Sequence, residues 1–305
     1  MQKGLFSFLN AAHETGWPPR WGAEDLPRHW LLNLHYFDFT WALEYEEARF
    51  LVTDWIQTYR LSRNRVGWES YAISLRLVNL SAFFFGAHRE RVDADIPFRN
   101  MLWESIFLQA EWLCRHMETN VGGNHLIENV AALALAGSCF SGAHADSWFR
   151  MGCRLLSKEI ARQVLPDGAH FGRSPMYQCR MTYVLATLLN TGDARLADLV
   201  CGPVGRMAEE LSRVCHPDGD IALFNDSALA LYNRPIPLIE YVAKLTGARL
   251  AAAGSGNGPF GLSSVGFFGA GNGAGEYVVV DAGPANRRFI FGHGHGGMFS
   301  FELSL

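Results

Sequence analysis

The sequence lacks the features that mark membrane proteins and nucleic-acid-binding proteins. No apolar run approaches the roughly 20 residues of a membrane-spanning helix, so we expect no membrane span. Positive charge is not in excess either, because 26 Lys and Arg stand against 30 Asp and Glu, for a net charge of −4. A protein that binds nucleic acid usually has a basic face, so nucleic acid is not an expected partner.

The sequence also lacks paired cysteines and a clear export signal. Its six cysteines are dispersed and form no C-x-x-C pair, which argues against a disulfide framework. We expect them to be buried as small apolar residues. The N-terminal segment has no convincing apolar core or cleavage site of a signal peptide. If Met1 is the natural start, the expected location is the cytoplasm.

The sequence does contain a long stretch with helical periodicity, from Trp30 to about Lys244. Apolar residues recur three and four positions apart in eight segments: 39–60, 69–90, 98–119, 124–140, 145–164, 175–192, 194–215 and 237–245. Short polar connections with Gly or Pro separate them, which indicates antiparallel neighbours. Runs such as NLSAFFFG and VAALALAG are apolar on more than one side, as in the inner layer of a two-layer helical array.

Near Ala252 the pattern changes from helical to extended. The segment AAGSGNGPF has the composition of a Gly-rich linker. Four short runs rich in β-branched and aromatic residues follow, at 263–270, 276–283, 287–294 and 298–305. We therefore predict a helical domain over residues 1–250 and the first strands of a β-domain over 260–305, which we expect to be incomplete at Leu305.

A polar cluster stands at the start of one predicted helix, in GGNHLIENVAAL. Asn124 occupies a typical N-cap position after two glycines, with His125 beside it and Glu128 one turn later. Capping explains all three residues. The same residues could instead bind a carboxylate, because free N–H groups, an amide and an imidazole would converge there. The spacing alone leaves both interpretations open.

A second polar cluster lies in PDGAHFGRSPMYQCR, a loop that leads into a helix. It contains His170, Arg173, Tyr177 and Arg180. Arg173 could pair with an anion through two hydrogen bonds. A tyrosine beside cations can have a lowered pKa and can exchange protons, so we expect Arg173 and Arg180 to lower the pKa of Tyr177. The alternative is a packed tyrosine with a satisfied hydroxyl group.

Two weaker groups of polar residues lie further along the chain. HPDGDIALFNDSAL offers Asp218, Asp220, Asn225 and Asp226 to a cation or a sugar hydroxyl, although turn formation also explains Pro217–Asp218–Gly219. In GHGHGG, two histidines two positions apart would face the same side of an extended segment, as in many metal sites. Two ligands are too few for a metal ion, and a Gly/His turn is the alternative.

Aromatic and Arg side chains also stand on two otherwise apolar helical segments. NLHYFDF (33–39) and WESYAISLRLVNL (68–80) include Tyr71 and Arg76, which would suit stacking on sugar rings in a cleft. Such residues are equally common in ordinary cores and interfaces.

Taken in order along the chain, these motifs resemble a known family. NLHYFDF, W-x-x-Y-x-x-S-x-R-x-x-N at 68–79, GNHLIEN, LPDGAHFGRSPMYQ, LFNDS and GHGHGGMFSFEL together resemble the heparinase II/III-like polysaccharide lyases and their relatives in bacterial surface-polysaccharide gene clusters. The resemblance extends from about Trp30 to Leu305. It implies an incomplete α/α toroid of antiparallel helices, followed here by the first strands of an antiparallel β-sandwich.

The resemblance also implies a reaction and roles for single residues. Family members, often periplasmic, cleave uronic-acid polymers such as alginate or heparan sulfate by β-elimination, which needs no cofactor. By this resemblance Asn124 and His125 bind the carboxylate, Tyr177 exchanges a proton, and His293 assists. His295 matches a structural zinc ligand, but the usual following acid is replaced by Gly296–Gly297. Around these residues, Arg173, Arg180, Tyr71, Arg76, Glu128 and His170 are candidates for contact with an acidic polysaccharide.

Two other functions fit the same residues. An inverting glycoside hydrolase would need two carboxylates across the cleft, for which Glu128 with Asp167, Asp220 or Asp226 are candidates. The loops around His125 and Tyr177 offer hydrogen-bond donors more than acids, which favours the lyase. A non-catalytic protein that binds glycan in a surface-polysaccharide pathway is the third interpretation.

Overall fold

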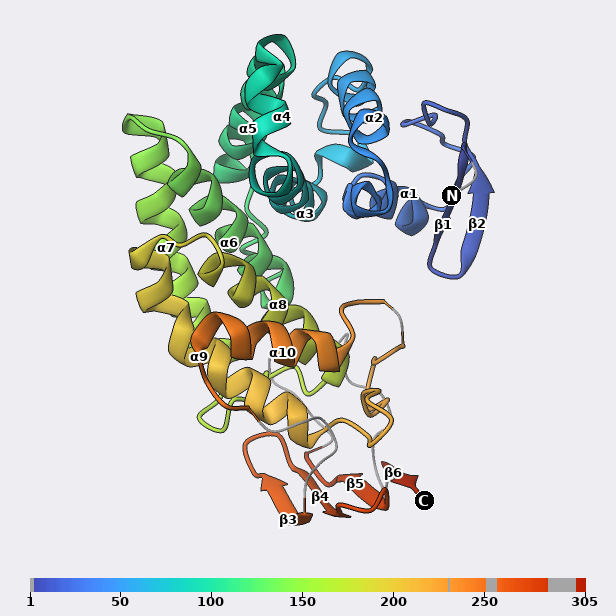
Figure 1. Cartoon of the computed structure of the whole chain (residues 1–305), viewed down its shortest axis with the longest axis vertical. Helices are drawn as coiled ribbons and strands as arrows, with labels where there is room; N and C mark the ends of the chain where they lie inside the picture. Colours follow the sequence, from blue (N-terminus) through green and yellow to red (C-terminus); the bar gives the residue numbers. More distant parts are fainter. Residues whose placement is uncertain (1–2, 230, 251–256, 285–299) are drawn as a thin grey trace. The chain divides into compact units, whose positions relative to one another are not determined.

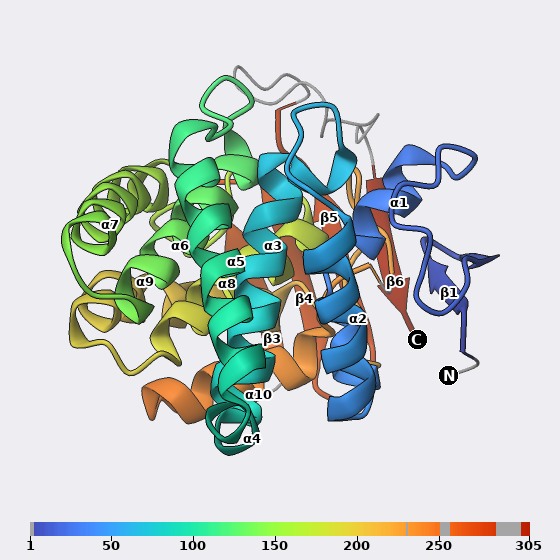
Figure 2. The same cartoon turned by 90° about the horizontal axis from the view of Figure 1, so that it is seen from above.

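The computed structural model describes residues 3–229, 231–250, 257–284 and 300–305. The chain forms two compact units. Figures 1 and 2 show the helices and strands of the chain from two directions. Unit 1 consists of Met1–Val121 and Glu128–Gly152, and unit 2 of Gly122–Ile127 and Cys153–Leu305. The division falls within two helices, so we describe the residues of each helix with the unit to which they belong. It does not test the predicted domains at 1–250 and 260–305, which stay a prediction.

Unit 1 is a helical array preceded by a hairpin. The elements before its last two helices are β1 Leu5–Phe8, β2 Ala11–Glu14, α1 Arg28–Leu34, η1 Asp38–Ala42, α2 Tyr45–Thr58, η2 Val66–Trp68, α3 Ser70–Leu80, the π-helix η3 Ser81–Ala87, α4 Arg89–Ala94 and α5 Ile96–Arg115. The C-terminal part of α6 Gly123–Cys139 and the N-terminal part of α7 Ala143–Gln163 complete it. Its core is strongly aromatic, with Trp30, Trp55, Phe84 and Trp148 fully buried.

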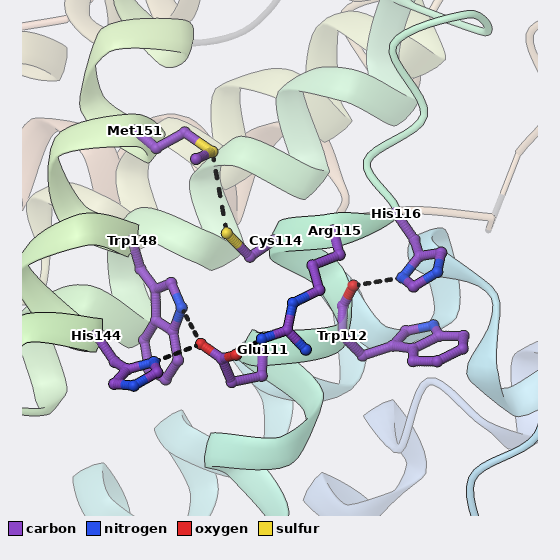
Figure 3. A network of polar contacts seen from close by, with 8 residues as sticks. All are labelled: Glu111, Trp112, Cys114, Arg115, His116, His144, Trp148 and Met151. Carbon is purple, nitrogen blue, oxygen red and sulfur yellow. Dashed lines mark hydrogen bonds and ion pairs between the residues drawn. The ribbon is translucent and has the colours of Figure 1, made fainter.

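One carboxylate joins α5 to α7 within unit 1 (Figure 3). Glu111 accepts hydrogen bonds from Nδ1 of His144 at 2.8 Å and from Nε1 of Trp148 at 2.9 Å, and it also pairs with Arg115. Burial alone would raise the pKa of Glu111, but the bonds from His144 and Trp148 and the charge of Arg115 lower it. The ionised carboxylate therefore holds the two helices together.

The stretch Ser70–Ala87 has the length and apolar composition of a membrane-spanning helix. In this structure 61% of it is buried inside the protein. It also contains the fully buried Arg76. A mostly buried helix in the core of a globular array meets the same criteria, so the stretch is weak evidence for a membrane span.

Unit 2 combines helices with a small sheet. Its elements after the end of α7 are α8 Pro175–Leu189, α9 Ala194–Arg213, α10 Pro235–Thr246, β3 Asn257–Leu262, β4 Phe267–Asn272, β5 Tyr277–Asp281 and β6 Ser300–Ser304. Helices α8, α9 and α10 pack against one another. The strands form one antiparallel sheet in the order β3-β4-β5-β6 (Figure 1). Alternate residues of β5 are buried (Tyr277, Val279 and Asp281), which shows that one face of the sheet is covered.

The switch from helices to strands agrees with the predicted fold class, with several local differences. The hairpin β1–β2 and strand β3 were not expected, and the predicted helix 69–90 is divided into α3, η3 and α4. The predicted strand 287–294 lies outside the described residues. All six cysteines are free as expected, but only Cys179 and Cys215 are buried. Cys114 and Cys153 are half-buried, and Cys139 and Cys201 are exposed, so the expected burial is wrong for these four.

Candidate active site

Two glycines set the start of α6. Gly122 and Gly123 have φ angles of 68° and 55°, in the left-handed region that glycine enters without steric cost. The helix begins at Gly123, so Asn124 is its second residue and not the N-cap that the sequence predicts. The glycines, rather than the asparagine, make the chain reversal. Asn124 is 4% exposed and His125 is half-buried, so both side chains stand at the first turn of the helix.

A chain of hydrogen bonds, which we name the Gln163–His170 link, joins the start of α6 to α8. Nε2 of Gln163 donates to the carbonyl of Gly123 at 2.8 Å, and Nε2 of His170 lies 3.1 Å from Oε1 of Gln163. The backbone N–H of His170 then donates to Oε1 of Gln178 at 2.6 Å. Gln178 is the next residue after Tyr177 on α8. The link therefore ties the backbone beside Asn124 to the helix that carries Tyr177.

The partners of His170 assign its role within this link. Its Nδ1 accepts a hydrogen bond from the N–H of Gly172 at 3.3 Å. The proton of the neutral ring therefore lies on Nε2, which donates to Gln163. His170 is buried and both of its ring nitrogens are engaged inside the protein. This arrangement gives His170 a positioning role, while its predicted contact with substrate stays a prediction.

Tyr177 lies in the first turn of α8 and is half-buried. Its ring centroid is 6.0 Å from that of Tyr232. Burial, followed by the nearby Tyr232 and Asp226, raises the pKa of Tyr177 well above its ordinary value of 10. The expectation that Arg173 and Arg180 lower this pKa is therefore wrong. The hydroxyl group stays protonated across the physiological range.

The two arginines have other neighbours, which explains this outcome. The guanidinium of Arg180 lies over the rings of Tyr183 and Tyr232, at 5.7 Å and 5.5 Å from their centroids. Arg173 is buried and forms an ion pair with Asp281 on β5. The shift in the pKa of Tyr177 is attributed to burial, Tyr232 and Asp226, and not to either arginine.

Arg173 anchors its loop to the sheet. Besides the pair with Asp281, its Nη1 donates to the carbonyl of Pro284 at 2.6 Å. Nδ2 of Asn225 donates to the carbonyl of Arg173 at 2.8 Å and lies 3.3 Å from Oδ2 of Asp281. Arg173 and Asn225 both have left-handed backbones, with φ of 54° and 59°. The surrounding contacts hold this costly conformation in place. The predicted binding of substrate by Arg173 stays a prediction.

Three other predicted residues lie in the interior of unit 1. The fully buried Arg76 donates from Nε to Gln109 at 2.7 Å and from Nη1 to the carbonyl of His35 at 3.0 Å, and its guanidinium lies 4.2 Å from the ring centroid of Trp55. Burial lowers the pKa of Arg76 to about 9. Tyr71 and Glu128 are also buried. These environments are those of core residues, and a direct contact with substrate stays a prediction for all three.

A comparison with known protein families shows to which family the chain belongs. Residues 27–237 match the family model described as Heparinase II/III N-terminus. The chain belongs to the heparinase II/III family. A curated member, the heparin-sulfate lyase of Bacteroides thetaiotaomicron, is 28% identical over 143 residues, which cover 41% of this chain and 20% of that protein.

Solved structures of heparinase II/III proteins share the fold. The heparan sulfate lyase HepC from Pedobacter heparinus matches with a TM-score of 0.61 at 19% identity, over 98% of this chain and 52% of that one. A crystal structure of heparinase III matches with a TM-score of 0.60 at 19% identity, over 90% of this chain and 48% of that one. The predicted class, a mainly α chain with an incomplete α/α toroid followed by antiparallel strands, is confirmed. The chain spans about half the length of these structures.

For this heparinase II/III family member, the described residues contain no group of three or more His, Cys, Asp or Glu that could hold a metal ion. His293 and His295 lie outside the described residues, so the zinc site and the role of His293 stay predictions.

Sequence reasoning missed Gln163, Gln178 and Tyr232 in this site. The two glutamines carry the Gln163–His170 link, and the ring of Tyr232 lies close to both Tyr177 and Arg180. Tyr232 precedes Pro235 in a short polar segment, YNRP, but that signal identifies a turn and not a site.

Proposed function

We propose that this protein is a polysaccharide lyase that cleaves a uronic-acid-containing glycan by β-elimination. One observation carries the proposal: the Gln163–His170 link ties the helix start that bears Asn124 and His125 to the helix that bears a protonated Tyr177. These groups are hydrogen-bond donors and a proton donor, which an elimination needs. The names of the relatives, heparin-sulfate lyase and heparan sulfate lyase, support an acidic glycan as substrate.

The chemistry explains why donors are needed. Removal of the proton at C5, next to the carboxylate of the uronic acid, places a second negative charge on the carboxyl group. An enzyme accelerates this step by binding the dianionic state more tightly than the substrate. The amide of Asn124 and the ring of His125 would donate to the carboxylate, and the positive end of the α6 dipole would add to their effect. One such donor contributes about 3 kcal/mol to the transition state.

Tyr177 would then act as the acid of the reaction. Its raised pKa keeps the proton on the hydroxyl group, where O4 of the departing sugar can take it. The C5 proton goes to a base, for which His293 is the candidate by resemblance. The electron pair of the C5–H bond forms the C4–C5 double bond, and the pair of the C4–O4 bond leaves with O4. No water molecule is consumed.

The test is the formation of the unsaturated uronate. Purified protein is incubated with heparan sulfate, heparin, alginate and related polymers, and the ultraviolet absorbance of the C4–C5 double bond is followed. We expect product from at least one polymer, and a loss of about 10²–10³-fold in kcat for Asn124→Ala. Asn190→Ala changes an exposed asparagine after α8 and serves as the matched control. Absence of the double bond with every polymer, or an unchanged rate for Asn124→Ala, would refute the proposal.

A further inference from the structure

A pocket of about 530 Å³ lies in unit 1, where the loop between α2 and η2 meets the segment before α1. Its volume is in the range of pockets that bind small molecules, such as one or two sugar residues. Asn124, His125 and Tyr177 belong to unit 2 and do not line this pocket. It is therefore a second place at which this chain can bind a ligand.

The inner wall of the pocket is apolar and holds one carboxylate in place. Trp21, Leu31 and Tyr59 line the pocket, and each is at most 6% exposed. Nε1 of Trp21 donates to Oδ2 of Asp54, which also lines the pocket, at 2.7 Å. Oδ1 of Asp54 has no hydrogen-bond partner among the described residues. Asp54 therefore offers one oriented acceptor to a ligand.

One cation in the lining is oriented in the same way. The guanidinium of Arg65 lies over the ring of Tyr59, 4.8 Å from its centroid, and its Nη1 donates to the carbonyl of Arg60 at 3.0 Å. Within the described part of the chain, Arg65 pairs with no carboxylate, and its Nε and Nη2 have no hydrogen-bond partner. A planar guanidinium fixed in this manner can bind the two oxygens of a carboxylate.

The other charges around Arg65 allow an anion to bind there. Arg60 and Arg63 of the same loop are exposed, and neither forms an ion pair with a described residue. Against these three cations, the lining contains two carboxylates, Glu24 and Asp54. Two ion pairs flank the lining residues in sequence: Arg20 with Asp25 and Arg28 with Glu69. The cations without a partner thus outnumber the carboxylates of the lining.

The two carboxylates narrow the choice of ligand. A simple anion at Arg65 would leave Glu24 and Asp54 without donors and would be repelled by them. An amine would suit these carboxylates but would leave Arg65 without an anion. The exposed side chains of Thr58 and Asn64 add a hydroxyl and an amide to the lining. A molecule that carries one carboxylate and several hydroxyl groups satisfies both kinds of charge.

We propose that this pocket in unit 1 is a second saccharide site, which binds a uronic acid residue of a glycan. The carboxylate of the sugar would pair with Arg65, and the ring hydroxyls would donate to Asp54 and Glu24. The apolar wall of Trp21 and Leu31 would contact the C–H groups of the sugar ring. This binding needs no cleavage, so it goes beyond the proposed lyase function.

Trp21 supplies a local signal for the test, because its indole N–H lies at the pocket. The whole chain is labelled with ¹⁵N, and the Trp21 indole signal is assigned by its loss in Trp21→Phe. The protein is then titrated with methyl glucuronide and with methyl glucoside, which has the same ring without the carboxylate. We expect a saturable shift of the Trp21 signal, with methyl glucuronide binding at least tenfold more tightly. The indole signal of Trp148, which lies outside the lining, is the control.

Three variants test the assigned contacts. Arg65→Gln should weaken the binding of methyl glucuronide at least tenfold, whereas the matched control Arg63→Gln, in the same loop but outside the lining, should change it less than twofold. Glu24→Ala should weaken the binding of both sugars, because their hydroxyl groups lose an acceptor. Tighter binding of methyl glucuronide by Glu24→Ala would show that this carboxylate only repels the ligand, and would overturn the assignment.

The site fails if the Trp21 signal does not respond, if the two sugars bind equally, or if Arg65→Gln binds methyl glucuronide as the parent does. Tighter binding of glucosamine than of methyl glucuronide would also overturn it. Asn124→Ala should leave the Trp21 titration unchanged, which separates this site from the candidate active site. If Trp21 responds but no polymer yields an unsaturated product, the lyase function fails and this site stands. If product forms but Trp21 does not respond, this site alone fails.

Discussion

Glu210 and Tyr177 both carry a proton at neutral pH because of their surroundings. Glu210 lies on α9 and is buried, and its Oε2 has no hydrogen-bond partner among the described residues. Burial, and then the charge of Asp167, raises the pKa of Glu210 to about 8. Burial likewise raises the pKa of Tyr177. These two side chains of unit 2 thus keep their protons at neutral pH. The proton on Glu210 affects stability, and the proton on Tyr177 affects the reaction.

The proton on Glu210 makes stability depend on pH. The unfolded chain loses this proton near pH 4.5, whereas the folded protein keeps it up to about pH 8. The free energy of unfolding should therefore fall as pH rises through this window, since the unfolded state binds fewer protons there. Glu210→Gln should reduce that fall, measured by urea unfolding at a series of pH values. The control is the exposed neighbour, Glu209→Gln. Equal slopes for the parent and Glu210→Gln would contradict this account.

The proton on Tyr177 should matter for rate and not for stability. Tyr177→Phe should lower kcat by about 10²–10⁴-fold, the usual contribution of a positioned acid. Because the ring remains, the midpoint of thermal unfolding should stay close to that of the parent. Tyr183→Phe, one turn or more further along α8, is the control and should retain activity. A Tyr177→Phe protein with the parent kcat would remove Tyr177 from the mechanism.

At the scale of secondary-structure elements, the ion pair between Arg173 and Asp281 joins a loop to strand β5. The two charges are buried together, and Asn225 contacts both residues. A buried pair of this kind costs more to break from one side than to remove whole, because the remaining charge stays without a partner. Breaking the pair from either side therefore distinguishes an anchoring role of Arg173 from a role in binding substrate.

We expect Arg173→Met and Asp281→Leu to destabilise the protein by about 3–5 kcal/mol each, and the double variant by less than the sum of the two. Unfolding in urea measures all three. If Arg173 acts as an anchor, Asp281→Leu should reproduce the effects of Arg173→Met. If the single changes leave stability intact and Arg173→Met alone raises KM, then Arg173 binds substrate as the sequence suggests.

At the scale of the whole molecule, the sequence predicts the elements with strong periodicity and misses the weak ones. Helix α8 is predicted because its apolar residues recur over four turns, and it begins at Pro175 in both the prediction and the structure, since proline favours the first helical position. Strands β1 and β2 have four residues each, too few for a pattern, and β3 contains the glycines that indicate a linker. A polypeptide segment this short takes its conformation from its tertiary neighbours.

The candidate site shows the same limit. The motifs identify Asn124, His125 and Tyr177, but they cannot show what holds these residues. The Gln163–His170 link joins residues of α6, α7 and α8 and of the loop between α7 and α8, and Arg173 and Asp281 are 108 positions apart. The prediction for the pKa of Tyr177 was wrong for this reason: burial, Tyr232 and Asp226 raise it, and Tyr232 and Asp226 are far from Tyr177 in sequence.

The measurement that tests the central claim most directly is cleavage of a uronate glycan in heavy-oxygen water, followed by mass spectrometry of the products. Elimination consumes no water, so we expect the product masses to sum to that of the substrate, with no heavy oxygen at the new ends and an unsaturated uronate on one of them. Products that gain the mass of water and carry heavy oxygen would identify a hydrolase and contradict the proposed lyase.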